Sequence, residues 1–581
     1  MKFRWSVAPP QPALAAELAS ALKVPLLLAQ CLVNRGLSEP AHCSSFLEPR
    51  LRHLADPFLI PGMPRAVERL FVARQNREPL VIFGDYDVDG VTSSALLLEV
   101  FQALGLVAHC YLPHRLEEGY GLSQEAVENC LKKFPVSLLL AVDCGSTSVG
   151  AIDLLGSRGI DVIVLDHHQV SSPPPAAFAL VNPQATRVAA SGSSSPAHLP
   201  FAELCSVGLS FKLAHALVKR GREAGLSAAA EFDLRPLLDL VALGTIADLV
   251  PLAGENRLLV SPGLERLNST QRPGLVALKQ VAQCRSPLSP VEVAFQLAPR
   301  LNAAGRLETA EAALHLLLAR TLDEALPLAR ELDSCNRERQ KLERHISDEA
   351  LKTVRASFEP EKHFVIVQGQ APWHVGVVGI VASRVLQQFY RPTLILGGDG
   401  IHYRGSGRSI AGFDLAAALR QCGDLLVNHG GHALAAGVTL LPEKLDEFRQ
   451  RLNDLARQTL SPEALQPVLR LDAEVNLREL NLECVQALSK LHPVGQGNPS
   501  VQFSACNVSQ PRAYQRMGAD KQHVKMWVSN GGPVFEAVWW SAGEAALPNG
   551  RFDVAFAPHI NEYNGNRVVQ LKVLDWREAT A

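Results

Sequence analysis

Acidic and histidine residues gather at three places in the first third of the chain. They are Asp85, Asp87 and Asp89, spaced two residues apart, the single Asp143, and the run Asp166, His167 and His168. Carboxylates crowded into one cleft repel one another unless protons or cations neutralise them. Carboxylate oxygen with imidazole nitrogen suits Mn²⁺, Mg²⁺ or Zn²⁺, and a set without thiolates argues against a structural zinc. Since two such ions can clamp the attacking and leaving oxygens of a phosphoryl transfer, the clusters predict hydrolysis of a phosphate ester.

Short apolar runs alternate with helical stretches from about residue 79. Strands are expected at residues 79–83, 107–112, 137–142 and 161–165, with the first helix near 91–104. This alternation predicts an α/β fold with a doubly wound parallel sheet, which binds ligands beyond the carboxyl ends of its strands. Asp85, Asp143 and Asp166 each follow one of these strands. The topology should therefore bring the three clusters to one site.

A further acid, Asp248, ends an apolar helical segment later in the chain. A carboxylate at a helix end is commonly a surface residue, but beside three metal-type clusters we interpret it as a further ligand. Residues 171–200, between the clusters and this segment, are rich in Pro, Ser and Ala and predict a loop or a partly mobile insertion.

The middle of the chain predicts a long helix and a second α/β unit. The helix spans residues 321–357, and Thr321 with Glu324 has the form of a capping box at its start. The second unit begins near residue 363. Its segments 404–409 and 429–437 place glycines beside Ser, Arg and His, so that backbone NH groups can approach an anion. Either segment alone could be a plain turn, but together they favour phosphate binding.

The last fifth of the chain changes to short β-like runs separated by Gly, Pro and Asn. The runs are residues 469–475, 501–508, 524–528, 534–540, 552–557 and 567–574. A small antiparallel β-barrel with interleaved aromatic and basic residues is typical of a platform for single-stranded nucleic acid, and Tyr514 and Trp527 are candidates to stack on bases. The alternative is that the aromatics fill the barrel core. Strand alternation requires at least one of Trp539 and Trp540 to point inward.

Length and composition set wider limits. A chain of 581 residues predicts about three to four domains. It has no apolar run of about 18 uncharged residues and no secretory signal pattern, so no membrane association is expected. The eleven cysteines form no CxxC pair, as expected for reduced thiols in the cytosol. The formal net charge of -2 neither supports nor excludes a nucleic-acid substrate, because local basic patches could supply the affinity.

The motifs resemble those of the DHH phosphoesterase superfamily, named for the motif at residues 166–168. The resemblance is closer to the RecJ family of single-strand-specific DNA exonucleases. Its motifs match residues 84–90, 114–121, 244–248, 300–306, 405–409 and 430–432, in the same order. It implies 5′-to-3′ degradation of single-stranded DNA to mononucleotides in recombination and repair, with two divalent ions, Mn²⁺ or Mg²⁺.

The resemblance also implies a domain order and partners. The expected domains are an N-terminal helical extension (1–60), a DHH domain (61–320), a linking helix (321–358), a DHHA1 domain (359–461) and a C-terminal OB-fold domain (462–581). Such a protein is expected to act as a monomer in the cytoplasm, with single-strand DNA-binding protein and a RecQ-type helicase as partners.

Individual residues take roles from the same resemblance. Asp87, Asp89, Asp143, His167 and Asp248 match metal ligands, with Asp143 as the bridge. Asp85 and His168 are expected to be ligands or proton handlers, and His168 could stabilise charge or protonate the leaving oxygen. Asp166 could orient His167, since ligating imidazoles usually donate their other NH to a carboxylate.

Candidate residues for holding DNA come from several motifs. They are Arg115, Arg306, Ser406 and Arg408 for the 5′-phosphate, and His432 for a backbone phosphate. Guanidinium groups match phosphate geometry, although Arg306 and Arg408 could instead form ordinary interdomain salt bridges.

Two other functions fit part of the pattern. One is a phosphodiesterase or pyrophosphatase acting on oligonucleotides or nucleotides, and the other is a catalytically dead relative that serves as a replication scaffold. The aromatic and basic C-terminal module favours a polymeric substrate over a small one. The complete set of ligand residues argues against a dead relative.

Overall fold

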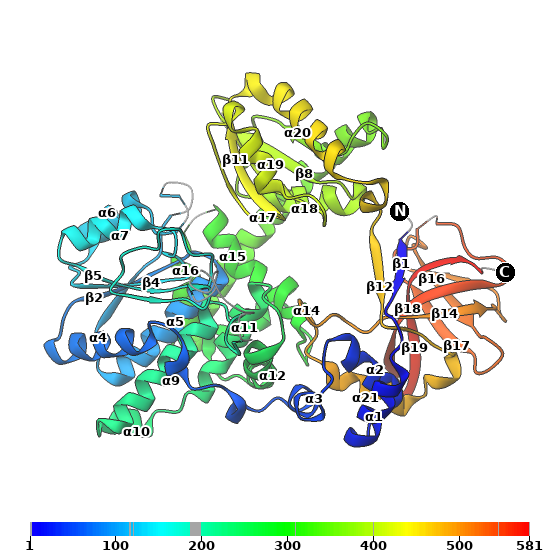
Figure 1. Ribbon diagram of the computed structural model, residues 1–581, viewed down its shortest axis with the longest axis horizontal. Coiled ribbons are helices and arrows are strands. Elements are labelled where there is room, and N and C mark those ends of the chain that lie inside the picture. Colours follow the sequence, from blue (N-terminus) through cyan, green and yellow to red (C-terminus); the bar gives the residue numbers. More distant parts are fainter. Residues whose placement is uncertain are drawn as a thin grey trace. The chain divides into compact units, whose positions relative to one another are not determined.

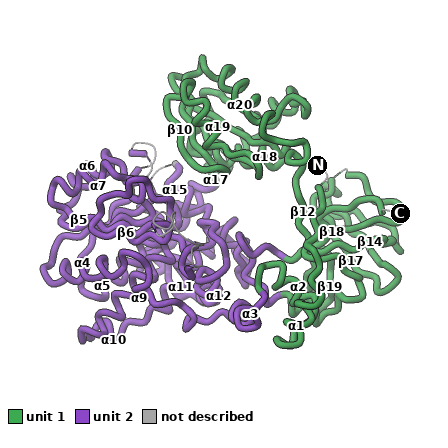
Figure 2. The backbone as a smooth tube through the Cα atoms, viewed as in Figure 1, with its two compact units in different colours: residues 1–37, 337–488, 501–581 green, residues 38–336, 489–500 purple. Residues whose placement is uncertain are grey.

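The computed structural model describes residues 3–114, 118, 119, 121–185, 199–307, 309–398, 400–543 and 545–579. The chain forms two compact units (Figure 2). Unit 1 comprises residues 1–37, 337–488 and 501–581, and unit 2 comprises residues 38–336 and 489–500. Each unit therefore combines segments that lie far apart in the sequence.

Unit 2 is built on a five-stranded sheet in which every neighbouring pair is parallel (Figure 1). The strand order is β3 (Ala108–Tyr111), β2 (Leu80–Gly84), β4 (Leu138–Val142), β5 (Asp161–Leu165) and β6 (Ala179–Val181). Successive side chains of β2 enter different cores, because they point to opposite faces of the sheet. One face is covered by α4 (Met63–Asn76), α5 (Val88–Leu104) and α9 (Ser206–Glu223), the other by α6 (Gln124–Lys133) and α7 (Val149–Ser157). The predicted doubly wound sheet is confirmed.

Two local predictions in this unit differ from the structure. Helix α5 begins at Val88 rather than near residue 91, because the Asp87 carboxylate caps it by accepting hydrogen bonds from the NH groups of Asp89 and Gly90. Within the expected loop 171–200, residues 179–181 form the edge strand β6, whose Ala179 and Val181 are buried. Residues 186–198, with the serine-rich run, lie outside the described residues.

The other helices of unit 2 surround this sheet. They are α3 (Pro40–Leu47), α10 (Ser227–Glu231), α11 (Leu238–Ala247), α12 (Gly254–Asn268), α13 (Pro273–Val281), α14 (Pro290–Glu292), α15 (Ala298–Leu307) and α16 (Glu311–Leu318). Helix α17 (Leu322–Ser357) begins in unit 2 and ends in unit 1. At its start the Thr321 hydroxyl accepts from the NH of Glu324, whereas the Glu324 carboxylate accepts from Arg320, one residue earlier than a capping box requires.

The first sheet of unit 1 is mixed. Its order is β10 (Asn428–Gly431), β11 (Ala435–Leu440), β9 (Tyr403–Arg408), β8 (Thr393–Gly398) and β7 (Ile366–Gly369), with helices α18 (Val378–Phe389), α19 (Leu415–Gln421) and α20 (Leu445–Thr459). Only β7 and β8 pair in parallel among these strands. The two glycine-rich segments are therefore mainly strand, in β9 and in the hairpin of β10 and β11, rather than two separate turns.

The C-terminal sheet has seven strands. Its order is β13 (Ala473–Glu474), β14 (Phe503–Val508), β18 (Phe552–Tyr563), β19 (Asn566–Glu578), β17 (Phe535–Trp539), β16 (His523–Val528) and β15 (Gln515–Met517). The prediction that it is antiparallel is wrong, since β13 with β14 and β17 with β19 are parallel. Strands joined by a hairpin, such as β18 and β19, must be antiparallel, whereas β17 and β19 are separated in the chain by β18 and can pair in parallel.

The N-terminal segment of unit 1 contains a strand as well as helices. Strand β1 (Arg4–Val7) pairs in parallel with β12 (Val468–Leu471), and the helices α1 (Pro12–Leu22) and α2 (Leu26–Asn34) follow. A further short helix, α21, spans Leu482–Leu488. Among helices in the described ranges, none alone is long and apolar enough to cross a membrane. Only α1 and α2 taken together, across a bend of 116°, have that length and composition.

An ion pair lies in the interior of unit 2, between α9 and α12. The Lys212 ammonium donates to a Glu255 carboxylate oxygen at 3.0 Å and to the carbonyl of Ala55 at 2.6 Å, and both charged side chains are at most 1% exposed. The same carboxylate oxygen accepts from the NH of Ala55 at 2.6 Å. Burial lowers the pKa of Lys212. The pair therefore fixes the segment around Ala55 but depends on both partners being present.

We expect Lys212→Met to lower the free energy of unfolding of unit 2 by about 3–5 kcal/mol, because it leaves the Glu255 charge buried without its partner. The double variant Lys212→Met/Glu255→Leu should lose less. Hydrogen exchange of peptides from α9 and α12 checks this, since about 1.4 kcal/mol corresponds to a tenfold faster exchange. Peptides from the C-terminal sheet are the internal reference. Equal losses in the single and double variants would contradict the expectation.

Candidate metal centre

Three acids sit one residue beyond neighbouring strands of the parallel sheet. The NH of Asp85 bonds to the carbonyl of Val142, that of Asp143 to Leu165 and that of Asp166 to Val181, at 3.1 to 3.2 Å. Each bond continues the ladder between adjacent strands by one step. The carboxyl ends of the strands thus bring acids that are far apart in sequence to one edge of the sheet.

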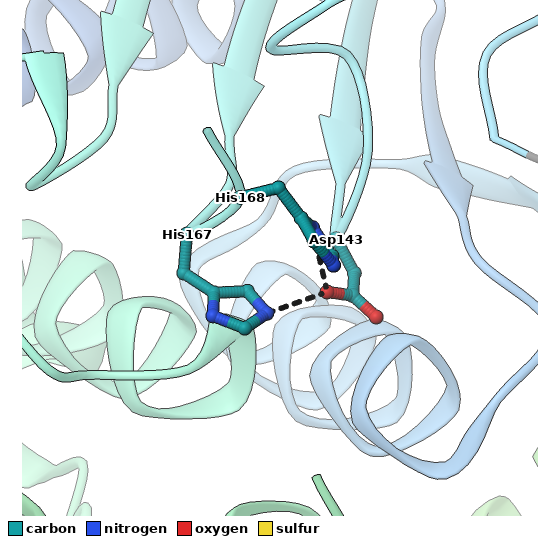
Figure 3. A group of neighbouring side chains, drawn as sticks. All are labelled: Asp143, His167 and His168. Atoms are coloured by element: carbon teal, nitrogen blue, oxygen red, sulfur yellow. Dashed lines mark ion pairs between the residues drawn. The ribbon is translucent and has the colours of Figure 1, made fainter. Parts of the chain in front are cut away.

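The side chains at this edge form three groups, and within each group the potential ligand atoms lie within 4.8 Å of one another. The groups are Asp85, Asp87 and Asp143; Asp143, His167 and His168; and Asp89, Cys205 and Asp248. Figure 3 shows the rings of His167 and His168 next to each other, with both directed toward the same oxygen of the Asp143 carboxylate. Asp143 belongs to two groups, the position that a bridging ligand requires.

The His167 ring links two of these groups. Its Nε2 lies 3.5 Å from an Asp143 oxygen and 3.5 Å from an Asp248 oxygen, and 3.9 Å from an oxygen of Asp89. Asp248 reaches this point from the C-terminal end of α11. All eight sequence-predicted residues of the acidic and histidine set therefore gather at one site.

The N-terminus of α9 anchors two of the buried acids. This role of α9 was not predicted from the sequence. The two oxygens of Asp89 accept from the backbone NH groups of Ser206 at 2.7 Å and Val207 at 2.8 Å, while the Ser206 hydroxyl donates to Asp143 at 2.9 Å. Unpaired NH groups at a helix start favour carboxylates. A single Ser at the start of a helix is too common a pattern to reveal this role from sequence. Cys205, beside it, was missed for the same reason.

Asp166 organises the histidines. Its carboxylate accepts from Nδ1 of His168 at 2.8 Å, from the NH groups of His167 and His168, and from the NH of Ser146. The ring it holds is therefore that of His168, and it contacts His167 through the backbone. This differs from the expectation that Asp166 orients the His167 ring.

The conformation of Asp143 is unusual for a residue other than glycine. Its φ is 63°, in the left-handed region, although its side chain is only 2% exposed. Asp tolerates this region better than most residues, but the conformation persists only where surrounding contacts hold it. The Ser206 hydroxyl and the ladder bond to Leu165 supply such contacts.

Burial and mutual repulsion raise the pKa values of the central carboxyl groups. Burial, then the charge of Asp87, raises the pKa of Asp89 to about 7, although two backbone NH groups oppose the shift. Burial and the charges of Asp89 and Asp87 raise the pKa of Asp248 to about 9. The same causes raise the pKa of Asp143 well above its ordinary value. Without added cations this cluster therefore binds protons at neutral pH.

The two histidines shift in opposite directions. Burial, with the neighbouring His168 charge, lowers the pKa of His167 to about 4, so this ring is neutral. Burial also opposes charge on His168, but the hydrogen bond and charge of Asp166 raise its pKa to about 9. His167 is thus suited to ligate a metal and His168 to carry a proton.

These residues fit divalent metal ions. Among the described residues, Nε2 of His167 and one Asp248 oxygen are buried and make no hydrogen bond, so both are left available as ligands. The carboxylate and imidazole donors are those that Mn²⁺ and Mg²⁺ accept. A cation would also relieve the repulsion that raises the pKa of Asp89.

Helix α15 braces the loop that carries the first three acids, another contact not predicted. The side-chain oxygen of Asn302 accepts from the NH of Val88 at 3.1 Å, and a Cβ at Gly305 would lie 2.8 Å from the carbonyl oxygen of Tyr86. Only glycine allows this approach. Arg306 is the next residue of the same helix.

The remaining predicted residues belong to other segments of the chain. Arg115 falls outside the described residues. Ser406 and Arg408 are on β9 of unit 1, where the Arg408 guanidinium donates to the Ser406 hydroxyl at 2.9 Å, and His432 is exposed beyond β10. In the C-terminal sheet the Tyr514 hydroxyl donates to the carbonyl of Pro548, and the Trp527 ring lies 5.6 Å from the guanidinium of Arg512.

We expect Mn²⁺ to bind with an affinity that rises with pH between 6 and 8. The pKa of Asp89 is raised to about 7, so below that pH a bound proton competes with the metal, and each proton displaced gives up to about a tenfold change per pH unit. Calorimetry in buffers of different ionisation enthalpy measures the affinity and the protons released. Asp248→Asn should release fewer protons. An affinity independent of pH would contradict the expectation.

Three family models match the chain. The model of the DHH family, N-terminal domain, matches residues 79–245; the DHHA1 domain matches 362–458; and the RecJ OB domain matches 471–575. These domains occur in the order implied by the resemblance, and the last one identifies the C-terminal sheet as an OB domain.

Curated relatives and a solved structure match almost the whole chain. It is 37% identical over 581 residues to the single-stranded-DNA-specific exonuclease RecJ of Bacillus subtilis, covering 99% of this chain and 71% of the relative. It is 36% identical to RecJ of Dickeya dadantii, covering 97% of each. The crystal structure of RecJ in complex with Mn²⁺ from Thermus thermophilus matches with a TM-score of 0.83 at 31% identity, over 100% of this chain and 80% of that one. The chain therefore belongs to the RecJ family.

Proposed function

We propose that this protein degrades single-stranded DNA from its 5′ end to mononucleotides, by metal-dependent hydrolysis of phosphodiester bonds, in DNA recombination and repair. The observation that carries the proposal is the convergence of Asp85, Asp143 and Asp166 at the ends of neighbouring strands, with His167 within 3.5 Å of Asp143 and Asp248. Membership of a family whose relatives are named single-stranded-DNA-specific exonucleases supports the substrate.

Two divalent ions, Mn²⁺ or Mg²⁺, would be held by Asp87, Asp89, Asp143, His167 and Asp248, with Asp143 between them and Asp85 close by. When bound, such ions supply Lewis acidity that activates water and stabilises charge on the phosphate. The NH groups of Ser206 and Val207 hold the Asp89 carboxylate in place and favour its charged form, which is the form that ligates a metal. Cys205 is near Asp89 and Asp248, but burial raises the pKa of its thiol, so oxygen ligands dominate.

His168 is assigned the proton transfer. Its Nδ1 is engaged by Asp166, which leaves Nε2 to stabilise charge or to donate a proton to the leaving oxygen. Its side chain is 35% exposed, so the ring can reach a substrate. Asp166 keeps the ring oriented and protonated.

Substrate contacts are assigned to the remaining basic and aromatic residues. Ser406 and Arg408 would hold the 5′-phosphate with Arg306 and Arg115, and so set the polarity, because a guanidinium group matches phosphate geometry. His432, which is exposed, would contact a backbone phosphate. Trp527 would stack on a base in the OB domain. Tyr514 is the weaker stacking candidate, since its hydroxyl is bonded within the domain.

Domain limits and partners follow from the family. We retain the boundaries 61–320, 321–358, 359–461 and 462–581 for the DHH domain, linking helix, DHHA1 domain and OB domain, which enclose the three family-model matches. The first 60 residues form an extension with one strand and helices. We further infer a cytoplasmic monomer that works with single-strand DNA-binding protein and a RecQ-type helicase, on the family resemblance alone.

The rival functions receive less support. A small-molecule phosphodiesterase does not account for the OB domain, because OB-folds commonly bind oligonucleotides or oligosaccharides. A dead scaffold does not account for eight acidic and histidine side chains that remain grouped at one site.

We expect a 5′-labelled single strand to release labelled mononucleotide at the earliest times with Mn²⁺, a 3′-labelled strand to release it last, and duplex to resist. EDTA should abolish cleavage. Asp143→Ala should lower the rate at least about 1000-fold, because it removes the shared ligand and several kcal/mol of charge stabilisation.

The matched control is Asp153→Ala, which removes an exposed carboxylate on α7 of the same unit. It should leave the rate unchanged. Cleavage in EDTA, early release from the 3′ end, or full activity in Asp143→Ala would each contradict the proposal.

We expect Asp166→Asn to move the basic limb of the pH–rate profile to lower pH. The acid form of His168 is lost as pH rises through its pKa, and the Asp166 carboxylate is what raises that pKa toward 9. Removing the charge returns the pKa toward its ordinary value of about 6.5. His168→Gln should lower kcat and abolish the limb. A limb that stays in place in Asp166→Asn would show that another group supplies the proton.

A further inference from the structure

The loop that follows Asp248 is held by residues that are not themselves candidate metal ligands. Asp248 ends α11, Leu249 adopts a left-handed φ of 61°, and the chain then crosses residues 250–253 before α12 begins at Gly254. A loop that leaves a ligand through such a turn needs support from outside, because local helix bonds do not fix it.

Asn256 ties this loop to the anchor of the other acids. Its side chain is buried, and its amide nitrogen donates to the carbonyl of Pro251 at 3.0 Å and to that of Glu203 at 2.5 Å. Glu203 lies three residues before Ser206, whose NH bonds Asp89 and whose hydroxyl bonds Asp143. One amide group therefore joins the loop after Asp248 to the segment that positions Asp89 and Asp143.

A distant segment of the chain, residues 489–500, presses on the same loop from another direction; we call it the strap. The NH of Leu252 donates to the carbonyl of Gln496 at 2.7 Å. A Cβ on Gly495 would lie 2.8 Å from Leu252 Cδ1, and a Cβ on Gly497 would lie 2.7 Å from Pro251 Cβ. The strap backbone is thus in direct contact with Pro251 and Leu252, and at Gly497, whose φ is 70°, a larger residue would meet the proline.

Arg257, next to Asn256 on α12, fixes the strap. Its guanidinium donates to the carbonyls of four successive strap residues, 490–493, at 2.8 to 3.2 Å, and to that of Phe46 at 2.7 Å. It is 1% exposed. Asn498 closes the strap internally by donating to the carbonyls of Leu491 and Pro493. Because a guanidinium group presents several NH donors in a rigid plane, its bonds to successive backbone carbonyls fix the position of the strap.

We propose that Asn256 is a positioning residue of the metal centre, which sets the distance between Asp248 and the pair Asp89 and Asp143. The strap supports the loop to which Asn256 is hydrogen-bonded. This rests on the proposed metal-dependent function. The residues touch no reacting group. They act through Asp248 on one side and Ser206 on the other, as supporting contacts of metal ligands commonly do.

The experiment compares Asn256→Ala with Asn268→Ala in the full chain. Asn268 is the matched control, because it lies on the same helix and its amide also donates to two carbonyls, those of Leu264 and Leu288. Mn²⁺ alone is the probe, with binding followed by electron paramagnetic resonance. Asn256→Ala should raise the Mn²⁺ Kd of one site by about 10-fold or more and lower kcat, with KM for single-stranded DNA unchanged. Asn268→Ala should lower the unfolding temperature to a similar extent but leave the Mn²⁺ Kd unchanged.

A second pair of variants tests the strap. Gly497→Ala puts a methyl group against Pro251, whereas Gly159→Ala, at a similar φ of 73° in the same unit, meets nothing within 4 Å. Both introduce comparable backbone strain, so only Gly497→Ala should weaken Mn²⁺ binding.

The outcomes separate this inference from the proposed function. Unchanged Mn²⁺ binding in Asn256→Ala and Gly497→Ala, in a wild-type protein that binds Mn²⁺ and cleaves DNA, would overturn the inference alone. Equal weakening by the control variants would overturn it as well, since the effect would then be general destabilisation. Wild-type protein that binds Mn²⁺ without cleaving DNA would overturn the exonuclease proposal and leave the positioning result standing. Wild-type protein that binds no Mn²⁺ would overturn both.

Discussion

The repulsion among carboxylates buried at one edge of a parallel sheet is the constraint on which unit 2 depends. Asp89 and Asp143 are almost fully buried, and their pKa values are raised by burial and by their acidic neighbours. Apolar surroundings would favour neutral acids. A site that must present charged ligands therefore needs cations, and it needs donors that hold each carboxylate in place until the cations bind.

Among the described residues, backbone NH groups supply most of these donors. Asp87 caps α5, and Asp89 takes the first NH groups of α9. Asp166 collects three backbone NH groups and one imidazole. Helix starts and strand ends supply partial positive charge that does not compete with a metal ion. Helices α9 and α12 carry no candidate ligand, but Ser206 of α9 donates to Asp143, and Asn256 of α12 donates to the carbonyl of Glu203 just before α9.

Most of the residues proposed to contact the substrate belong to unit 1. Its first sheet brings Ser406 and Arg408 together on one strand, and its C-terminal sheet carries the aromatic residues. Only part of that aromatic set is free to serve a ligand. Tyr514 and Trp576 donate to backbone carbonyls, and Trp5 bonds Asp575, whereas Trp540 is about half exposed. The buried aromatic side chains of this module are phenylalanines, among them Phe503, Phe552 and Phe556, whereas Tyr514, Trp527, Trp539 and Trp576 are only partly buried.

The sequence by itself determined the parallel sheet, the three clusters at its strand ends and the domain order, because hydrophobic periodicity and short motifs are local signals. Residues such as Asp143 and His167 could be named for the same reason. Only the tertiary structure decided that Ser206 and Asn256 support the ligands, that Asp166 holds His168, and that the C-terminal sheet is mixed. These features depend on segments far apart in the chain: residues 489–500 contact a loop some 240 positions earlier, and no spacing rule records such a pairing. Ser206 and Asn256 are of common residue types, and they gain a role at the site only because folding places each of them within hydrogen-bonding distance of two groups from different segments.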